Sequence, residues 1–193
     1  MPRNDKDKIM TTLTIGLLPL SLELYDKVLG IEQTQTIRAF AGVVEGEYQA
    51  RGIAVVAAPA CRKRDEFQTA VERFEAADVD AIVTLHLAYS PSLEAIDALA
   101  ETALPLIVLD TTPDAGFGFD CPSERILFNH GIHGVQDLCN MLIRRRKPFA
   151  LEAGHWQKSD VIDRSLSVLR GYRAAKAIRR SRVGIVGEPF DGM

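Results

Sequence analysis

The sequence has no apolar run approaching the length of a transmembrane helix, and its charges nearly balance. Its 193 residues include 23 Lys and Arg against 26 Asp and Glu, which gives a formal net charge of −3. A membrane span needs about 20 consecutive apolar residues, and obligatory binding to nucleic acid or membrane surfaces usually needs a strong excess of positive charge. We therefore expect neither a membrane nor a nucleic acid as partner.

Cysteine is scarce, with only three in the chain and no CxxC pair. An odd count without paired spacing indicates reduced thiols and a cytoplasmic protein, and it gives no support to a catalytic Cys–His pair. The start of the chain is polar and contains no secretory hydrophobic segment. We expect residues 1–12 to form a disordered tail.

Glycine-rich phosphate loops are also missing, because neither GxxxxGK nor GxGxxG occurs after an apolar run. Nucleotide binding by a familiar motif is therefore not expected. Four consecutive cations stand at Arg144–Lys147, at the end of a helical pattern. There they complement the helix dipole, an interpretation we favour over a phosphate site.

Five short apolar runs alternate with helical patterns along the chain. The runs are continuously apolar, which is typical of a parallel sheet covered on both faces. They are Leu13–Leu18 (ended by Pro19), Ile53–Ala58, Ala81–Leu85, Leu106–Leu109 and Phe149–Leu151. Right-handed crossovers then predict an α/β protein with a flavodoxin-like, doubly wound, five-stranded parallel sheet in a three-layer α/β/α sandwich, spanning residues 13–180.

The helical patterns lie between these runs. Helical spacing is cleanest where Phe67 and Phe74 stand seven residues apart, with Ala70 and Val71 between them. Ser92 is expected to cap the next helix. The others are expected over Tyr25–Arg51, Ile132–Leu142 and from Asp160 to about Arg180, with a long loop over Asp110–Glu124.

The carboxyl ends of parallel strands are where such sheets bind ligands. All four histidines (His86, His130, His133, His155) and the single Trp156 follow predicted strands at that edge. Aromatic faces with imidazole and amide groups suit a polyhydroxylated ligand such as a sugar. The alternative is that loops simply collect polar residues.

A metal site within the chain has weaker support. His130 and His133 share helical spacing, and Glu152 and His155 follow the fifth run, but no HExxH frame is present. We expect no metal ligands in this chain.

Four segments resemble the L-fucose and L-arabinose isomerase families. Ile15–Asp26 resembles their first strand and turn, and Leu85–Ser92 is similar to a segment in which an aromatic residue, Ser and Pro follow the third strand. Asn129–Leu138 is similar to their Asn-x-x-x-His-Gly segment. Arg182–Met193 resembles the stretch that opens their second domain, so residues 181–193 are expected to be its truncated start.

The resemblance implies an aldose–ketose isomerase of carbohydrate metabolism. In these enzymes a divalent metal, usually Mn2+, polarises the C1–C2 oxygens of the sugar while carboxylates move a proton through an enediol. The metal ligands and carboxylates belong to later domains. The flavodoxin-like N-terminal domain assembles the homo-oligomer and lends residues to a neighbouring subunit's active site.

The same resemblance implies which residues contact the sugar. By motif match they are Leu20, Leu22, Tyr25 and His133. Tyr89 and His130, which follow predicted strands at the same end of the sheet, complete the expected set of sugar contacts. His130 stands where arabinose isomerases carry glutamine, and residues 21–24 depart from their Gln-His-Leu-Tyr sequence, which favours a fucose-isomerase-like relative. Alternatively, the two leucines pack the first helix on the sheet and Tyr25 is an ordinary aromatic at a helix start.

Two other functions remain open. The chain alone is expected to be catalytically inert. The main alternative to an isomerase domain is a stand-alone sugar-binding or regulatory module without catalysis. A racemase-type α/β enzyme is less favoured, because it would need paired cysteines at strand ends and only Cys61 closely follows an apolar run.

Overall fold

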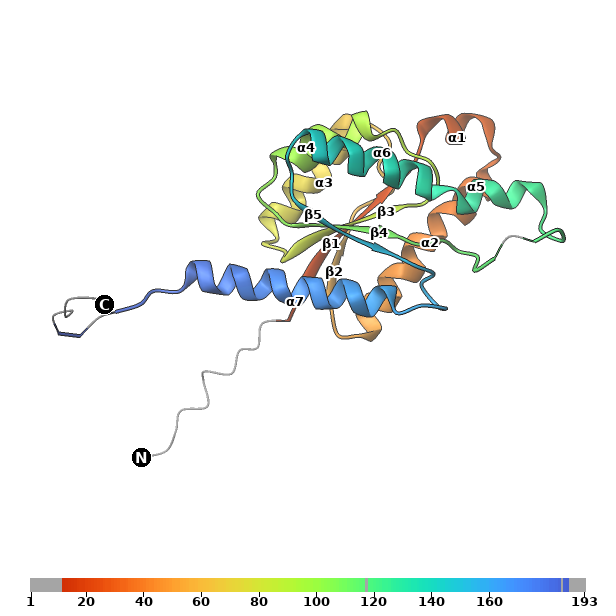
Figure 1. Ribbon diagram of the computed structural model, residues 1–193. Coiled ribbons are helices and arrows are strands. Elements are labelled where there is room, and N and C mark those ends of the chain that lie inside the picture. Colours follow the sequence, from red (N-terminus) through yellow and green to blue (C-terminus); the bar gives the residue numbers. More distant parts are fainter. Residues whose placement is uncertain (1–11, 117, 185, 188–193) are drawn as a thin grey trace.

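A five-stranded parallel sheet forms the centre of the molecule (Figure 1). The computed structural model describes residues 12–116, 118–184 and 186–187. The strands run in the order β2-β1-β3-β4-β5 and all pair in parallel. This is the predicted flavodoxin-like order. The strands are β1 (Thr14–Leu20), β2 (Ala54–Ala57), β3 (Ala81–His86), β4 (Leu106–Asp110) and β5 (Phe149–Ala153).

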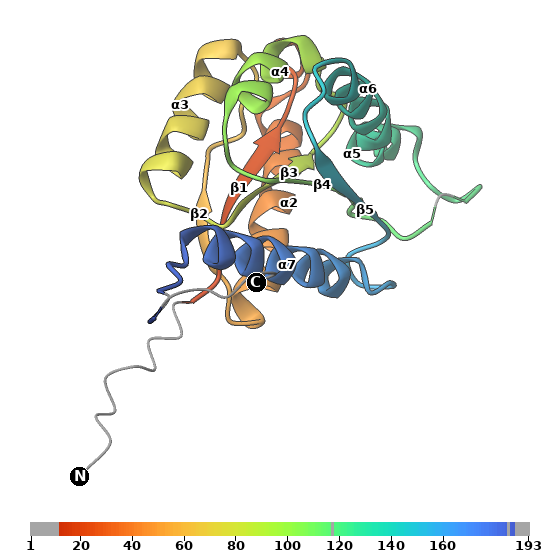
Figure 2. The same ribbon diagram turned by 60° about the vertical axis from the view of Figure 1, so that its left-hand side comes forward.

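Helices cover both faces of the sheet, which confirms the three-layer α/β/α sandwich (Figure 2). One face carries α3 (Arg64–Ala76), α4 (Ser92–Glu101) and α6 (Gly131–Arg144), and the other carries α2 (Ile31–Ala50) and α7 (Val161–Arg180). Side chains alternate across the central strands, so Leu18 packs on the first face and Leu17 on the second. Short α1 (Glu23–Val28), η2 (Ser123–Arg125) and α5 (Ile126–Asn129) complete the chain.

The first strand is longer than predicted, because it continues through Pro19 to Leu20. A proline inside a central strand normally removes a ladder hydrogen bond. Here β2 has already ended, since its last pair with β1 is Leu17 with Ala57. The carbonyl of Pro19 still accepts a 2.9 Å hydrogen bond from the Cys61 amide, so the strand end stays anchored.

Two helix starts also differ from expectation. The segment predicted as one helix is divided into α1 and α2, and Gly30 precedes α2 with its amide donating to the Gln33 side chain at 3.2 Å. Ser92 is the first residue of α4, after the capping Pro91. Its hydroxyl donates to Asp137 of α6 at 2.8 Å, so this serine joins two helices.

Most of the predicted tail over residues 1–12 lies outside the described residues, as do Ile185 and residues 188–193. In the parts of 181–193 that are described there is no strand, and Val183 and Val186 are exposed. No helix within the described ranges is long and apolar enough to cross a membrane.

An arginine covers the last outward-facing carbonyl on each edge of the sheet. Arg73 of α3 donates to the Ala57 carbonyl of β2 at 3.1 Å, and Arg164 of α7 donates to the Ala153 carbonyl of β5 at 2.7 Å. Unpaired edge carbonyls are templates for pairing with another chain. The two arginines therefore oppose sheet extension at the same relative position on both edges.

The tightest packing constraint on β1 is at Gly16, which faces Phe74 of α3. A Cβ at this position would lie 2.5 Å from the Phe74 ring, whereas a Cβ on Gly42 of α2 would meet no atom within 4 Å. We predict that Gly16→Ala lowers the free energy of unfolding by about 2 kcal/mol through overpacking. The control Gly42→Ala should raise it by about 0.5–1 kcal/mol through helix propensity. Chemical denaturation measures both, and equal effects would contradict the packing.

Candidate functional site

The candidate site lies where the carboxyl ends of β1 and β3 meet, the point at which the strand order reverses. There the hydroxyl of Tyr25, in α1, lies 2.8 Å from His130 Nε2, between α5 and α6. The two rings meet edge to face with centroids 6.1 Å apart. The contact joins residues separated by 105 positions in the sequence, both of them sequence-predicted site residues.

The protonation pattern of His130 follows from its partners. Its Nδ1 lies 2.9 Å from the Ile126 carbonyl, which can only accept, so Nδ1 carries the hydrogen. In the neutral ring Nε2 is then an acceptor, and Tyr25 donates to it. Burial raises the pKa of Tyr25, and the nearby Tyr89 adds to the effect, so the phenol keeps the proton it donates.

His133 lies one turn further along α6 and is exposed to solvent. Its Nδ1 lies 3.2 Å from the His130 carbonyl and donates to it, and the two imidazole centroids are 6.0 Å apart. None of the hydrogen bonds among described residues involves His133 Nε2. In the neutral ring this nitrogen is an acceptor that faces outward, available to a ligand hydroxyl.

Both histidines line an open hollow of about 390 Å³ between the β4 loop and the start of α6. The remaining lining comes from the loop after β4 and from α5 and α6. It consists of Thr112, Asp114, Ala115, Gly116, Ile126, Asn129 and Ile132. Both apolar and hydrogen-bonding side chains therefore line a cavity of the size that small ligands use.

A salt bridge that sequence reasoning missed holds one wall of this hollow. Arg125 donates to both carboxylate oxygens of Asp114 at 2.6–2.8 Å, and the Asn129 amide adds a 2.7 Å hydrogen bond. Burial alone would raise the pKa of Asp114, but these donors hold it below its usual value. The sequence offered no signal for this pair, because Asp114 lies inside the expected loop over Asp110–Glu124 and Arg125 directly follows it, where no periodic pattern is present.

The floor beneath α6 is His86, the last residue of β3. This side chain is 3% exposed, and burial lowers its pKa to about 3, so the ring is neutral. A Cβ on Gly134 would lie 2.4 Å from the ring, and one on Gly131 would lie 2.7 Å from the His86 carbonyl. The glycines of the Asn129–Gly134 segment therefore let α6 sit directly on the end of β3.

The other predicted contact residues are divided between core and rim. Leu20 is completely buried in the cluster beneath α3 and α4, which favours its packing alternative. Leu22 and Tyr89 are half-buried, and the Leu22 carbonyl accepts the Tyr25 amide at 3.1 Å where α1 begins. These two residues stay predictions as sugar contacts.

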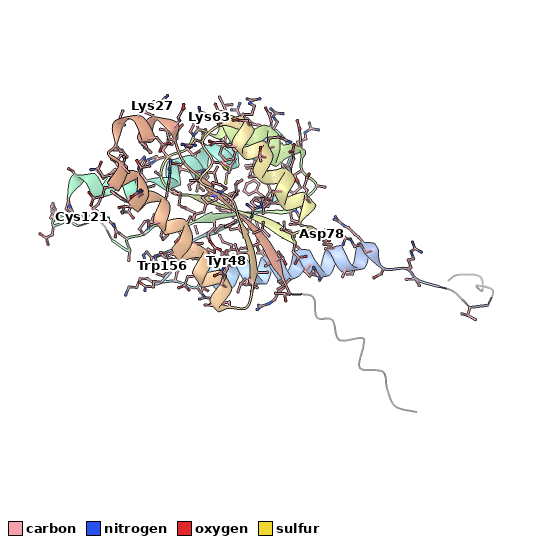
Figure 3. All side chains as sticks on the ribbon, turned by 180° about the vertical axis from the view of Figure 1, so that it is seen from behind. Lys27, Tyr48, Lys63, Asp78, Cys121 and Trp156 are labelled. Atoms are coloured by element: carbon pink, nitrogen blue, oxygen red, sulfur yellow. The ribbon has the colours of Figure 1, made fainter. Side chains whose placement is uncertain are left out.

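His155 and Trp156, which follow β5, contact other parts of the chain and are not among the residues that line the hollow. His155 Nδ1 accepts from the Gln157 and Lys158 amides at 3.1 Å, so its Nε2 donates to the Pro113 carbonyl at 3.3 Å. Trp156 packs edge to face on Phe40 of α2 at 6.4 Å, on the side of the sheet seen in Figure 3. This part of the predicted rim therefore fastens the loop and does not line the hollow.

The side chains at this edge do not make a metal centre. Across the described residues no group of three or more His, Cys, Asp and Glu gathers as ligands would. The hollow offers two histidines and Asp114, whose carboxylate is already held by Arg125. A resident Mn2+ therefore does not fit the residues that are present.

Comparisons with known proteins give no family. No family model and no curated protein matches the sequence. Among solved structures, the chain is similar to the Lac repressor bound to ONPG (15% identity, TM-score 0.34, 76% of this chain and 49% of that one). It is also similar to the Escherichia coli transcriptional repressor ascG (14%, 0.34, 75% and 60%).

A third similar structure is an ABC transporter periplasmic solute binding protein from Actinobacillus succinogenes with bound D-allose (16%, 0.34, 75% and 59%). The chain spans about half to three fifths of the length of these structures. At such low similarity they carry no argument about ligand or activity, and the fold assignment depends on the strand order itself.

The neutral, buried His86 predicts a pH dependence of stability. Its pKa is lowered on folding, so below pH 6.5 the unfolded chain takes up a proton that the folded chain refuses. Its contribution to stability is present above pH 6.5 and is lost as pH falls towards 3. Relative to His86→Leu, the native protein should lose about 1.4 kcal/mol of unfolding free energy per pH unit in that window. Urea titrations at several pH values measure the unfolding free energy of both proteins. If it changes with pH in the same way in both, the prediction is wrong.

Proposed function

We propose that this chain is the N-terminal domain of an aldose–ketose isomerase of the L-fucose/L-arabinose isomerase type. In this proposal Tyr25, Tyr89, His130 and His133 form one wall of a sugar site. The acid/base carboxylates and the ligands of the Mn2+ come from parts of the protein outside this chain. When bound there, the metal would supply polarisation of the sugar's C1 and C2 oxygens.

The observation that carries the proposal is the hydrogen bond between Tyr25 and His130. The two residues come from separate segments that resemble the same isomerase families, and they meet at the sheet edge where parallel sheets bind ligands. His133 lies beside His130, and these two histidines line the hollow, while Tyr25 lies outside its lining and contacts His130. Two segments that resemble the same families and lie far apart in the sequence therefore come into contact.

The chemistry of this wall suits recognition and not catalysis. Because His133 Nδ1 donates its hydrogen to the His130 carbonyl, His133 Nε2 can accept a hydrogen bond from a sugar hydroxyl. The Tyr25 hydroxyl donates to His130, and its oxygen can still accept a hydrogen bond. Apolar edges of Ile126 and Ile132 can cover the C–H faces of a pyranose. Burial raises the pKa of Asp110 at the end of β4, but this carboxyl does not line the hollow, and the carboxylate of Asp114, which does line it, is held by Arg125.

Exposed apolar side chains beside the hollow support a covering partner. Leu24, Val28, Ile31 and Ile126 are each more than half exposed, on α1, α5 and the start of α2. These elements lie together at one end of the sheet in Figure 1. Apolar groups gathered around a ligand hollow are typical of surfaces that bind other proteins. A neighbouring subunit of a homo-oligomer is the partner in this proposal.

The direct test is a titration of the chain with a panel of aldoses and ketoses, followed by NMR of the histidine and tyrosine side chains. We expect binding at millimolar affinity, because only one wall of the site is present, with shifts at Tyr25, His130 and His133. Tyr25→Phe should weaken it by roughly threefold to tenfold, the value of one hydrogen bond. Gln136→Ala, exposed on the same α6 and outside the hollow, is the matched control.

Three results would contradict the proposal, each in a different part. Shifts in no side chain of the hollow with any sugar would contradict the sugar site. Tight binding by a monomer would instead favour the stand-alone sugar-binding module. Turnover of any sugar by this chain with added Mn2+ would contradict the assignment of the catalytic groups to other parts of the protein.

A further inference from the structure

A second hollow, of about 440 Å³, opens at the opposite end of the sheet, where the strands begin. It is lined by the residues that immediately precede β3, β4 and β5 and by the last turns of α7. Asp78 lines it, and in Figure 3 this residue lies beside α7, at the other end of the molecule from Lys27 on α1. The hollow is therefore separate from the candidate sugar site.

Positive charge exceeds negative charge in this hollow. Lys147, Lys176, Arg179 and Arg180 line it, against the carboxylates of Asp78 and Asp80 only. The two aspartates are already engaged. Lys176 and Arg180 bind Asp78 at 2.9 and 3.1 Å and lower its pKa to about 2, while Asp80 accepts from Arg173 at 2.6 Å and from the Thr14 amide at 3.0 Å.

Lys147 and Arg179 remain without a carboxylate partner. Lys147 is half-buried, and its ammonium donates to the Thr102 carbonyl. Burial lowers the pKa of Lys147, and the negative charge of Glu75 opposes this shift only in part. None of the side-chain hydrogen bonds or ion pairs among described residues involves the guanidinium of Arg179. The half-buried Lys147 and the exposed Arg179 thus line one cavity as two cations in excess.

Apart from Tyr172, whose hydroxyl donates to the Leu106 carbonyl at 3.3 Å, the rest of the lining is apolar. Leu104 and Pro105 precede β4, and Pro148 precedes β5. A cavity of this volume is larger than an inorganic anion needs, and its apolar side offers contact to a small organic group.

We propose that this hollow binds a small organic phosphate monoester, with the dianionic phosphate on Lys147 and Arg179 and the organic group against Leu104, Pro105 and Pro148. A phosphate monoester carries close to two negative charges at neutral pH, which matches the two cations in excess. Lys147 is the last of the four cations that the sequence interpretation assigned to the helix dipole. In the structure Lys147 lines this cavity, while Arg145 pairs with Asp97.

Phenyl phosphate is the probe, and isothermal titration calorimetry is the measurement. We expect saturable one-to-one binding that weakens about tenfold in Lys147→Met and in Arg179→Met, the value of one charge-assisted hydrogen bond. Methionine keeps the aliphatic stem of each side chain. Thermal unfolding checks that Lys147→Met still folds, and Arg179→Met tests the site without disturbing any described contact.

Arg144→Met is the control, because it changes net charge equally and its guanidinium contacts Asn140 outside the hollow. Unchanged affinity in this variant supports a defined site. An equal loss in Arg144→Met would show general electrostatic attraction and overturn the proposal. So would the absence of saturable heat, or inorganic phosphate binding as tightly as phenyl phosphate.

Discussion

The seating of α6 on the end of β3 is the contact on which the candidate site depends. Gly131 and Gly134 approach His86 so closely that any side chain at either position would collide with it. This approach sets the height of the first turn of α6, and so places His130 within hydrogen-bond distance of Tyr25. The buried, neutral side chain of His86 thus supports the segment that carries His130 and His133. The three histidines have different roles because their surroundings differ.

The parallel sheet gives the two ends of the molecule different chemistry. At the carboxyl ends, loops and short helices present aromatic and imidazole groups with few free charges around an open hollow. At the amino ends, ion pairs around Asp78 and Asp80 fasten α7 to the sheet and leave uncompensated cations beside them. On each outer strand an arginine binds the last outward-facing carbonyl, which opposes extension of the sheet at that point.

The fold could be predicted from sequence because continuous apolar runs and turn residues report burial directly, as in Ala81–Leu85. The exceptions depend on contacts distant in sequence. Pro19 is tolerated only because β2 has ended, and Ser92 faces Asp137 rather than capping its own helix. Of the site, the convergence of Tyr25 and His130 followed from topology. The burial of His86 did not, because it depends on the distant glycines of α6 that cover the end of β3. The salt bridge between Asp114 and Arg125 did not either, because side-chain pairing in irregular segments leaves no periodic pattern.

The central claim is that Tyr25 and His130 meet and interact. A double-mutant cycle of Tyr25→Phe and His130→Ala, followed by urea unfolding, measures that interaction separately from the other effects of each substitution. A coupling energy of about 1 kcal/mol is predicted for a partly buried hydrogen bond. Strictly additive effects of the two substitutions would contradict the contact, and with it the site built around it.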